Sequence, residues 1–131
     1  LAMRRALDDA SMPPERVGHI SAHGTSTAQN DLMETLAVKE IFGDRAYDIP
    51  MNSIKSMVGH SISNAGSLEC VAACQTLLDG VIPPTINLAH PDPKCDLDYV
   101  SDGARRMSVD LVLSNSFAFG GHNVSLALAR V

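Results

Sequence analysis

Helical patterns alternate with short apolar segments along this chain, and that alternation restricts the possible folds more than any other feature. Residues 2–10 carry apolar side chains at helical spacing, and Pro13-Pro14 ends that helix before an apolar segment at residues 17–22. Asp31 is expected to cap a second helix that ends at Gly43. The first units are therefore helix, strand and helix.

The remaining sequence continues this pattern. We expect a short strand at residues 49–54, a helix at 68–78, an irregular proline-rich surface crossing at 83–93, and two final strands at 111–117 and 123–128. A glycine turn joins the last two strands, so the sheet should be mixed rather than purely parallel. The fold class predicted is α/β, with a mixed sheet covered by helices.

Composition limits the function classes. The 131 residues are enough for one domain, 45% of them are hydrophobic, and no apolar run approaches the roughly 20 residues needed to span a bilayer. Lys and Arg number 10 against 15 Asp and Glu, which gives a net charge of −5, and the basic residues are scattered. Neither membrane spanning nor nucleic-acid binding is expected. Three cysteines without framework spacing favour reduced thiols and a cytoplasmic location.

Two histidines lie in glycine-flanked loops, which are the places where α/β folds build their sites. His23 follows the segment at 17–22, and His60 follows the segment at 49–54. Imidazole titrates near neutrality, so either ring can donate a hydrogen bond or transfer a proton. From the residues alone, each histidine remains either a functional group or an ordinary loop residue.

Four segments, taken in order, resemble the motifs of the β-ketoacyl-acyl carrier protein synthases. They are AHGTST at residues 22–27, KSMVGH at 55–60, PPTIN with PDP and DLDY within 83–99, and NSFAFGGHN at 115–123. The resemblance covers residues 1–131 and is to the C-terminal part of an elongating enzyme, either synthase II or a type II polyketide ketosynthase. It implies the C-terminal half of a thiolase-like fold. The N-terminal half with the nucleophilic cysteine is expected to be absent here, since Leu1 already lies in a helical pattern.

The resemblance also implies a reaction. A cysteine takes the acyl chain, malonyl-acyl carrier protein loses carbon dioxide, and the resulting enolate attacks the acyl thioester to give β-ketoacyl-acyl carrier protein. His23 and His60 match the two histidines that stabilise the enolate oxygen. Lys55 matches a lysine that pairs with a glutamate, here Glu69, to orient the site. The alternative for this pair is a surface lysine and an unrelated helix-face glutamate.

Further site residues follow from the same resemblance. Thr25 and Thr27 match positions that contact the phosphopantetheine arm. Alternatively, they only turn the loop, with Thr27 or Asn30 helping the next helix to start. Phe119 matches a gate over the acyl pocket whose amide lies in the oxyanion hole, with Phe117 beside it. Ala118 replaces a family glycine and makes the gating role less secure. Alternatively, both phenylalanines are core residues at a strand end.

The cysteines do not match the family's nucleophile. Cys70 and Cys74 have the i, i+4 spacing of a core stripe on a helix, and Cys95 lies in the proline-rich crossing. Neither the cysteines nor the histidines follow a zinc-binding spacing, so no metal and no cofactor is expected.

Three alternatives to a catalytic ketosynthase segment remain. The first is a non-catalytic partner of the chain-length-factor type, which usually lacks the histidine motifs. The others are a degradative thiolase and an unrelated α/β domain. For the enzyme, the expected partners are acyl carrier protein, the N-terminal half of the ketosynthase, and a second subunit in a homodimer or a ketosynthase-like heterodimer. The product, a fatty acid or a polyketide, is not specified by the sequence.

Overall fold

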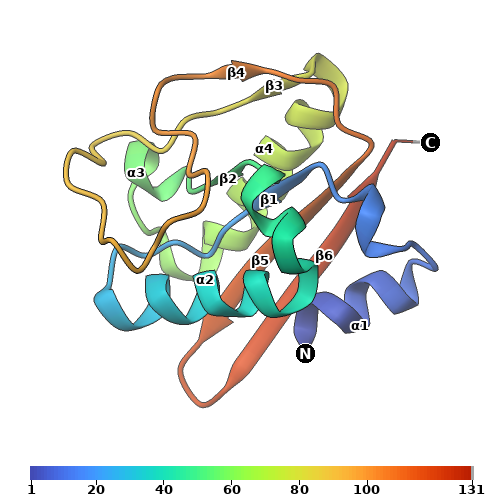
Figure 1. Ribbon diagram of the computed structural model, residues 1–131, viewed down its shortest axis with the longest axis horizontal. Coiled ribbons are helices and arrows are strands. Elements are labelled where there is room, and N and C mark those ends of the chain that lie inside the picture. The colour runs from blue at the N-terminus through green and yellow to red at the C-terminus, as the bar shows by residue number, and fades with distance from the viewer. Residues whose placement is uncertain (131) are drawn as a thin grey trace.

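The structure is a computed structural model that describes residues 1–130 (Figure 1). Its helices and strands, in chain order, are α1 (Ala2–Asp9), β1 (His19–Ser21), α2 (Ala28–Phe42), β2 (Met51–Asn52), α3 (Lys55–Val58), α4 (Ala65–Asp79), β3 (Val81–Ile82), β4 (Arg105–Arg106), β5 (Leu111–Ala118) and β6 (His122–Ala129). The described part of the chain contains no helix that combines the length and apolar character needed to cross a membrane.

The main sheet has four strands in the order β2-β1-β5-β6. β1 is parallel to both β2 and β5, whereas β5 and β6 form an antiparallel hairpin. The predicted mixed sheet is therefore confirmed. β3 and β4 form a separate antiparallel pair. β3 lies just before the proline-rich crossing and β4 lies after it, and the sequence pattern predicted neither strand.

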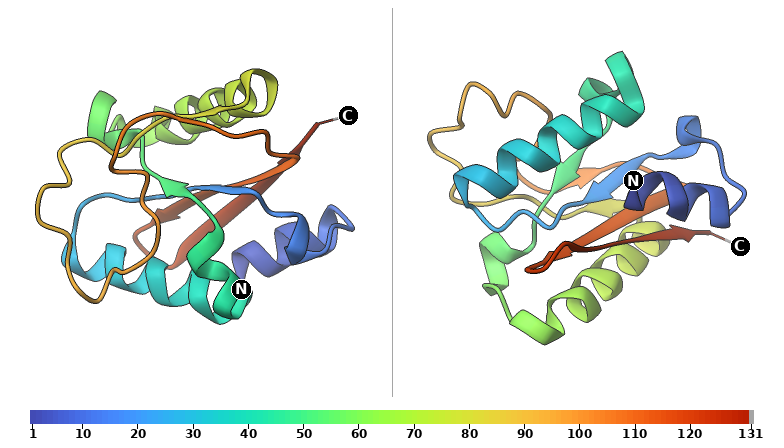
Figure 2. Two further views of the ribbon diagram at one scale, coloured as in Figure 1. Left: turned by 45° about the horizontal axis from the view of Figure 1, so that its top comes forward. Right: turned by 90° about the horizontal axis from the view of Figure 1, so that it is seen from below.

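Helices cover both faces of the main sheet, with α1 and α2 on one face and α4 on the other (Figure 2). Successive side chains of a strand point to opposite faces, so β5 contributes to two cores. Leu111 and Leu113 pack with α1 and α2 side chains such as Leu7 and Val38. Val112 packs on the other face with a cluster that includes Leu77 of α4.

The start of α2 agrees with the alternative interpretation of Thr27 and not with the expected cap at Asp31. Thr27 is the N-cap, because its hydroxyl accepts a hydrogen bond from the backbone N–H of Asn30 at 3.3 Å. Asp31 lies in the first turn instead, where a carboxylate interacts favourably with the helix dipole. The expected end at Gly43 is confirmed. The strand expected at 49–54 is confirmed only for its centre, β2.

The interpretation of Cys70 and Cys74 as a core stripe is wrong. Cys70 is half-buried and Cys74 is exposed, because the sheet-facing side of α4 is made by other residues, among them Glu69, Ala73 and Leu77. The outward side of α4 is nevertheless apolar: Val71 is 61% exposed, and Leu68 and Leu78 are also exposed. When a helix is apolar on both sides, the spacing of its apolar residues does not show which side is buried. The cysteines were therefore assigned to the wrong side of α4.

Candidate active site

The two predicted histidines lie side by side. β1 and β2 are adjacent parallel strands, so the loops that follow them begin at the same edge of the sheet, and these loops carry His23 and His60. Their ring centroids are 5.7 Å apart, with the ring planes at 85°. The ring of Phe117 on β5 lies 5.5 Å from that of His23. The two imidazoles are therefore close together, although only His60 lines the cavity described below.

His60 is exposed and has one nitrogen free for a ligand. Its Nδ1 accepts a hydrogen bond from the backbone N–H of Ile62 at 3.2 Å. A neutral imidazole that accepts at one nitrogen carries its proton on the other, so Nε2 of His60 is a donor. This nitrogen can therefore donate to an oxygen bound between the two rings.

His23 is buried, and its imidazole is neutral at physiological pH. Burial lowers the pKa of His23 to about 4, and the positive charge of Lys55 and the neighbouring His60 act in the same direction. Nδ1 of His23 has no hydrogen-bond partner among the described residues. The ring thus acts as a neutral hydrogen-bonding group rather than as a cation.

Lys55 and Glu69 form a buried ion pair behind the histidines. Their side chains are only 6% and 2% exposed, so the alternative of a surface lysine with an unrelated glutamate is wrong. Lys55 Nζ also donates to the backbone carbonyl oxygen of His23 at 2.6 Å. Ser116 Oγ donates to the second oxygen of Glu69 at 3.4 Å. The pair therefore links α3, α4, β5 and the backbone of the His23 loop.

Glu34 is a further site residue that the sequence analysis missed. One carboxylate oxygen accepts from the N–H of His23 and the other from the N–H of Gly24, both at 3.0 Å. Asn115 Nδ2 donates to the first oxygen at 3.0 Å. Burial raises the pKa of Glu34, while these hydrogen bonds and the charge of Lys55 lower it. The available signal was spacing: Glu34 lies on the same buried stripe of α2 as Val38 and Phe42, and a buried carboxylate requires partners.

Gly24 brings the His23 loop against the end of β2. Its φ is +41°, and a Cβ at this position would lie 2.5 Å from Cβ of Ser53. Ser53 Oγ donates to the carbonyl oxygen of Gly24 at 2.8 Å. A side chain at residue 24 is incompatible with both the backbone conformation and this contact.

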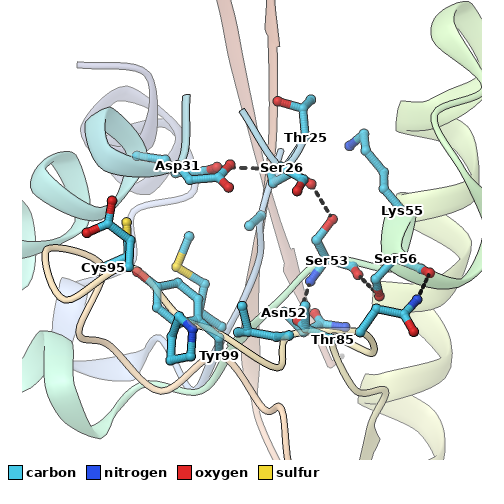
Figure 3. A pocket seen from close by; sticks show the side chains of 18 of the residues that line it. Thr25, Ser26, Asp31, Asn52, Ser53, Lys55, Ser56, Thr85, Cys95 and Tyr99 are labelled. Carbon is cyan, nitrogen blue, oxygen red and sulfur yellow. Dashed lines mark hydrogen bonds between the residues drawn. The ribbon is translucent and has the colours of Figure 1, made fainter. Parts of the chain in front are cut away.

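A cavity of about 570 Å³ opens beside the His23 loop (Figure 3). Asp31 and Tyr99 lie on one wall, and Lys55 and Ser56 lie on the opposite wall. His60 and Thr25 also line the cavity, whereas Thr27 does not. The Thr27 hydroxyl caps α2 and lies 3.3 Å from that of Thr25. Of the two threonines, Thr25 is thus the one that a ligand in this cavity can reach.

The β5-β6 hairpin places Phe119 at its tip. Phe119 is fully exposed, and Gly120 and Gly121, which follow it, have φ values of +82° and +80°. Phe117 is half-buried. The alternative that both phenylalanines are core residues is therefore wrong for Phe119, while a gating role remains a prediction.

Residues 1–89 match the family described as the β-ketoacyl synthase C-terminal domain. The chain belongs to this family. It is 50% identical over 129 residues to 3-oxoacyl-[acyl-carrier-protein] synthase 2 of Synechocystis, covering 98% of this chain and 31% of the relative. It is also 50% identical to the tetracenomycin polyketide synthase ketoacyl synthase alpha subunit of Streptomyces glaucescens, covering 98% and 30%.

Solved structures agree with this assignment. One matching chain comes from the structure of a type II PKS acyl-carrier protein in complex with its ketosynthase bound to the hexaketide. The TM-score is 0.95 at 41% identity, and the match covers 98% of this chain and 31% of that chain. The ishigamide ketosynthase/chain length factor gives a TM-score of 0.94 at 41% identity, with coverage of 98% and 32%. The predicted thiolase-like α/β fold is confirmed. The chain spans about a third of the length of these relatives.

Proposed function

We propose that this chain is the C-terminal part of a condensing enzyme that acts in fatty acid or polyketide biosynthesis. The reaction is decarboxylative Claisen condensation of malonyl-acyl carrier protein with an acyl-enzyme thioester. The supporting observation is the neutral, buried ring of His23 with its centroid 5.7 Å from that of the exposed donor His60. Two imidazoles so placed can hydrogen-bond one thioester oxygen.

The role of His23 and His60 in this reaction is to stabilise the negative charge that develops on the thioester oxygen. When the C–C bond to the malonyl carboxylate breaks, carbon dioxide leaves and the electron pair is delocalised onto the thioester oxygen. His23 and His60 stabilise that enolate oxygen. The enolate carbon then attacks the acyl-cysteine carbonyl, and the cysteine sulfur leaves as a thiolate. Cys95 lines the cavity but does not match the family's nucleophile, and Cys70 and Cys74 lie on α4 away from the cavity, so the nucleophile is proposed to come from another part of the synthase.

Other residues support this function. Lys55, neutralised by Glu69, positions His23 through its carbonyl oxygen. Thr25 offers a hydroxyl to an amide-rich phosphopantetheine arm in the cavity, whereas Thr27 caps α2 and supports Thr25 through the contact between their hydroxyls. Phe119, with Phe117 at its base, forms a gate over the acyl site.

The outward face of α4 indicates that this segment works as part of a larger assembly. An exposed stripe with Leu68, Val71 and Leu78 is costly in water. We propose that the N-terminal half of the ketosynthase covers this stripe and supplies the nucleophilic cysteine. The complete enzyme is proposed to be a cytoplasmic homodimer or ketosynthase-like heterodimer that receives its substrates from acyl carrier protein.

The test uses a chimeric synthase in which this chain replaces the matching segment of the Synechocystis relative. Decarboxylation of malonyl-acyl carrier protein and acyl transfer to the cysteine are measured separately. Loss of a donor to the enolate oxygen should reduce decarboxylation by about 10²- to 10³-fold in both His23→Ala and His60→Ala, as at other oxyanion sites. His122→Ala, an exposed histidine, is the matched control and should retain activity. Decarboxylation that depends on neither His23 nor His60 would contradict the proposed function, whereas a chimera that does not decarboxylate at all would favour the non-catalytic chain-length-factor alternative.

A further inference from the structure

A chain of hydrogen bonds joins the β5-β6 hairpin to the His23 loop. Ser125 on β6 lies directly opposite Asn115 on β5, and its hydroxyl donates to Asn115 Oδ1 at 2.9 Å. Asn115 Nδ2 donates in turn to the Glu34 carboxylate oxygen that accepts the N–H of His23. Four residues on four different segments thus form one continuous network.

Ser125 determines which way the Asn115 amide faces. An amide side chain presents a donor on one side and an acceptor on the other, and the two orientations differ by a 180° flip. In the flipped orientation Asn115 Oδ1 would face the Glu34 carboxylate, and two acceptors would oppose each other without a proton between them. The hydroxyl of Ser125, by donating to Oδ1, stabilises the orientation in which Nδ2 faces Glu34.

Burial makes this orientation matter. Asn115 and Glu34 are almost completely buried, so water cannot replace a lost partner at either side chain. The other contact of Asn115 Nδ2 is with the sulfur of Met3 at 3.5 Å, which is a weak acceptor. The Glu34 oxygen that accepts the hydrogen bond from Asn115 also accepts the one from the His23 N–H. A change in the position of Asn115 therefore affects His23 through this one oxygen atom.

We propose that Ser125 is a positioning residue for the condensation reaction, acting on His23 through Asn115 and Glu34. This inference rests on the proposed function. It assigns to β6 a role in the chemistry although Ser125 itself touches neither imidazole. It also means that the hairpin carrying Phe119 and the loop carrying His23 do not move independently.

One consequence is a change in the pH dependence. Two kinds of neighbour lower the pKa of Glu34. One is the positive charge of Lys55, and the other is the set of hydrogen-bond donors to the Glu34 carboxylate, which includes Asn115. Without Ser125 the Asn115 donor is less well held, so Glu34 takes up a proton at higher pH. A protonated Glu34 holds the amides of His23 and Gly24 more weakly, and the acid limb of the decarboxylation profile should move to higher pH.

The experiment compares Ser125→Ala, Ser125→Thr and Ser101→Ala in the chimeric synthase. Ser125→Ala should lower kcat for malonyl decarboxylation about five- to tenfold with little change in KM, as expected for one lost buried hydrogen bond that matters in the transition state. It should also shift the acid limb upward and speed hydrogen exchange at the amides of His23 and Gly24. Ser125→Thr keeps the hydroxyl and should restore all three properties. Ser101→Ala removes an exposed hydroxyl and should change none.

The outcomes separate this inference from the proposed function. If Ser125→Ala matches Ser101→Ala in kcat, pH profile and exchange while His23→Ala abolishes decarboxylation, the positioning role is wrong and the proposed function stands. If Ser125→Ala and Ser125→Thr lose activity and melting temperature together, Ser125 is merely structural and the inference fails. If His23→Ala itself leaves decarboxylation unchanged, the proposed function fails, whereas faster exchange in Ser125→Ala would still show the hydrogen-bonded link.

Discussion

Lys55 donates a hydrogen bond from Nζ to the carbonyl oxygen of His23, with 2.6 Å between the two atoms. On the other side of the same residue, the backbone N–H of His23 donates to Glu34 at 3.0 Å. A cation from α3 and an anion from α2 therefore hold one backbone unit between them. Charge-assisted hydrogen bonds are the stronger kind, and here they fix a loop that contains only small residues after His23.

The first prediction separates the two roles of Lys55. Lys55→Met leaves the Glu69 carboxylate buried without its cation, which should destabilise the fold by about 3–5 kcal/mol. Lys55→Met with Glu69→Leu removes both charges and should recover most of that loss in urea unfolding of the chimeric synthase. Decarboxylation should stay impaired in the double variant, because His23 still lacks its donor. Equal stability of the single and double variants would contradict the ion-pair argument.

The second prediction concerns Gly24, with Gly43 as its matched control. Both have positive φ, at +41° and +57°, but a Cβ at residue 43 meets nothing within 4 Å, whereas one at residue 24 would collide with Ser53. Gly43→Ala should therefore cost only the backbone strain, about 1–3 kcal/mol. Gly24→Ala should cost roughly 1–3 kcal/mol more and should also lower decarboxylation, because the His23 loop must shift. Similar melting temperatures for the two variants would show that the loop has room.

Local patterns predicted much of this fold and part of the site. The helix end at Gly43 could be predicted because glycine adopts positive φ without strain, and Gly80 ends α4 in the same way. The resemblance also grouped His23, His60 and Lys55, and the structure brings the two rings to 5.7 Å and Lys55 onto the backbone of His23. The start of α2 stayed open because Thr27 and Asp31 are both acceptable capping residues, and only the geometry shows which one accepts the Asn30 amide.

What the sequence did not reveal depends on distant partners. Glu34 and Asn115 are 81 residues apart, and their contact follows from the packing of α2 on β5 rather than from either local pattern. Ser125 meets Asn115 only through the hairpin register. A polar residue on an otherwise apolar stripe is the signal that such a network exists, but its partners require the three-dimensional structure.

The third prediction is a loss of stability in acid caused by His19. This ring is 1% exposed, its Nε2 donates to Asn52 Oδ1 at 2.8 Å, and burial lowers its pKa to about 4. The unfolded chain, with an ordinary pKa near 6.5, binds the proton more tightly than the folded one, so stability is full above pH 6.5 and falls below it. Between pH 8 and pH 5 the loss should be about 2 kcal/mol.

Substitution at His19 tests this directly. His19→Gln keeps a donor for Asn52 but cannot titrate, so its unfolding free energy should fall less steeply between pH 8 and pH 5. Part of the slope should remain, because the pKa of His23 is also lowered to about 4. His90→Gln removes an exposed histidine and serves as the control. An unchanged slope in His19→Gln would mean that the folded protein accommodates the protonated ring.

The fourth prediction concerns the gate. Phe119 is fully exposed at the hairpin tip, so Phe119→Ala removes no core packing within this chain and should lower the melting temperature of the chimeric synthase much less than Phe117→Ala does. Malonyl decarboxylation should also persist, because Phe117, not Phe119, contacts the His23 ring. Acyl transfer to the cysteine should change instead, since the ring no longer blocks or opens the channel while Gly120 and Gly121 absorb the backbone movement. Phe117→Ala is the matched comparison and should lower stability and decarboxylation together. If Phe119→Ala reduces both half-reactions equally, Phe119 supports the site as a whole and does not gate it.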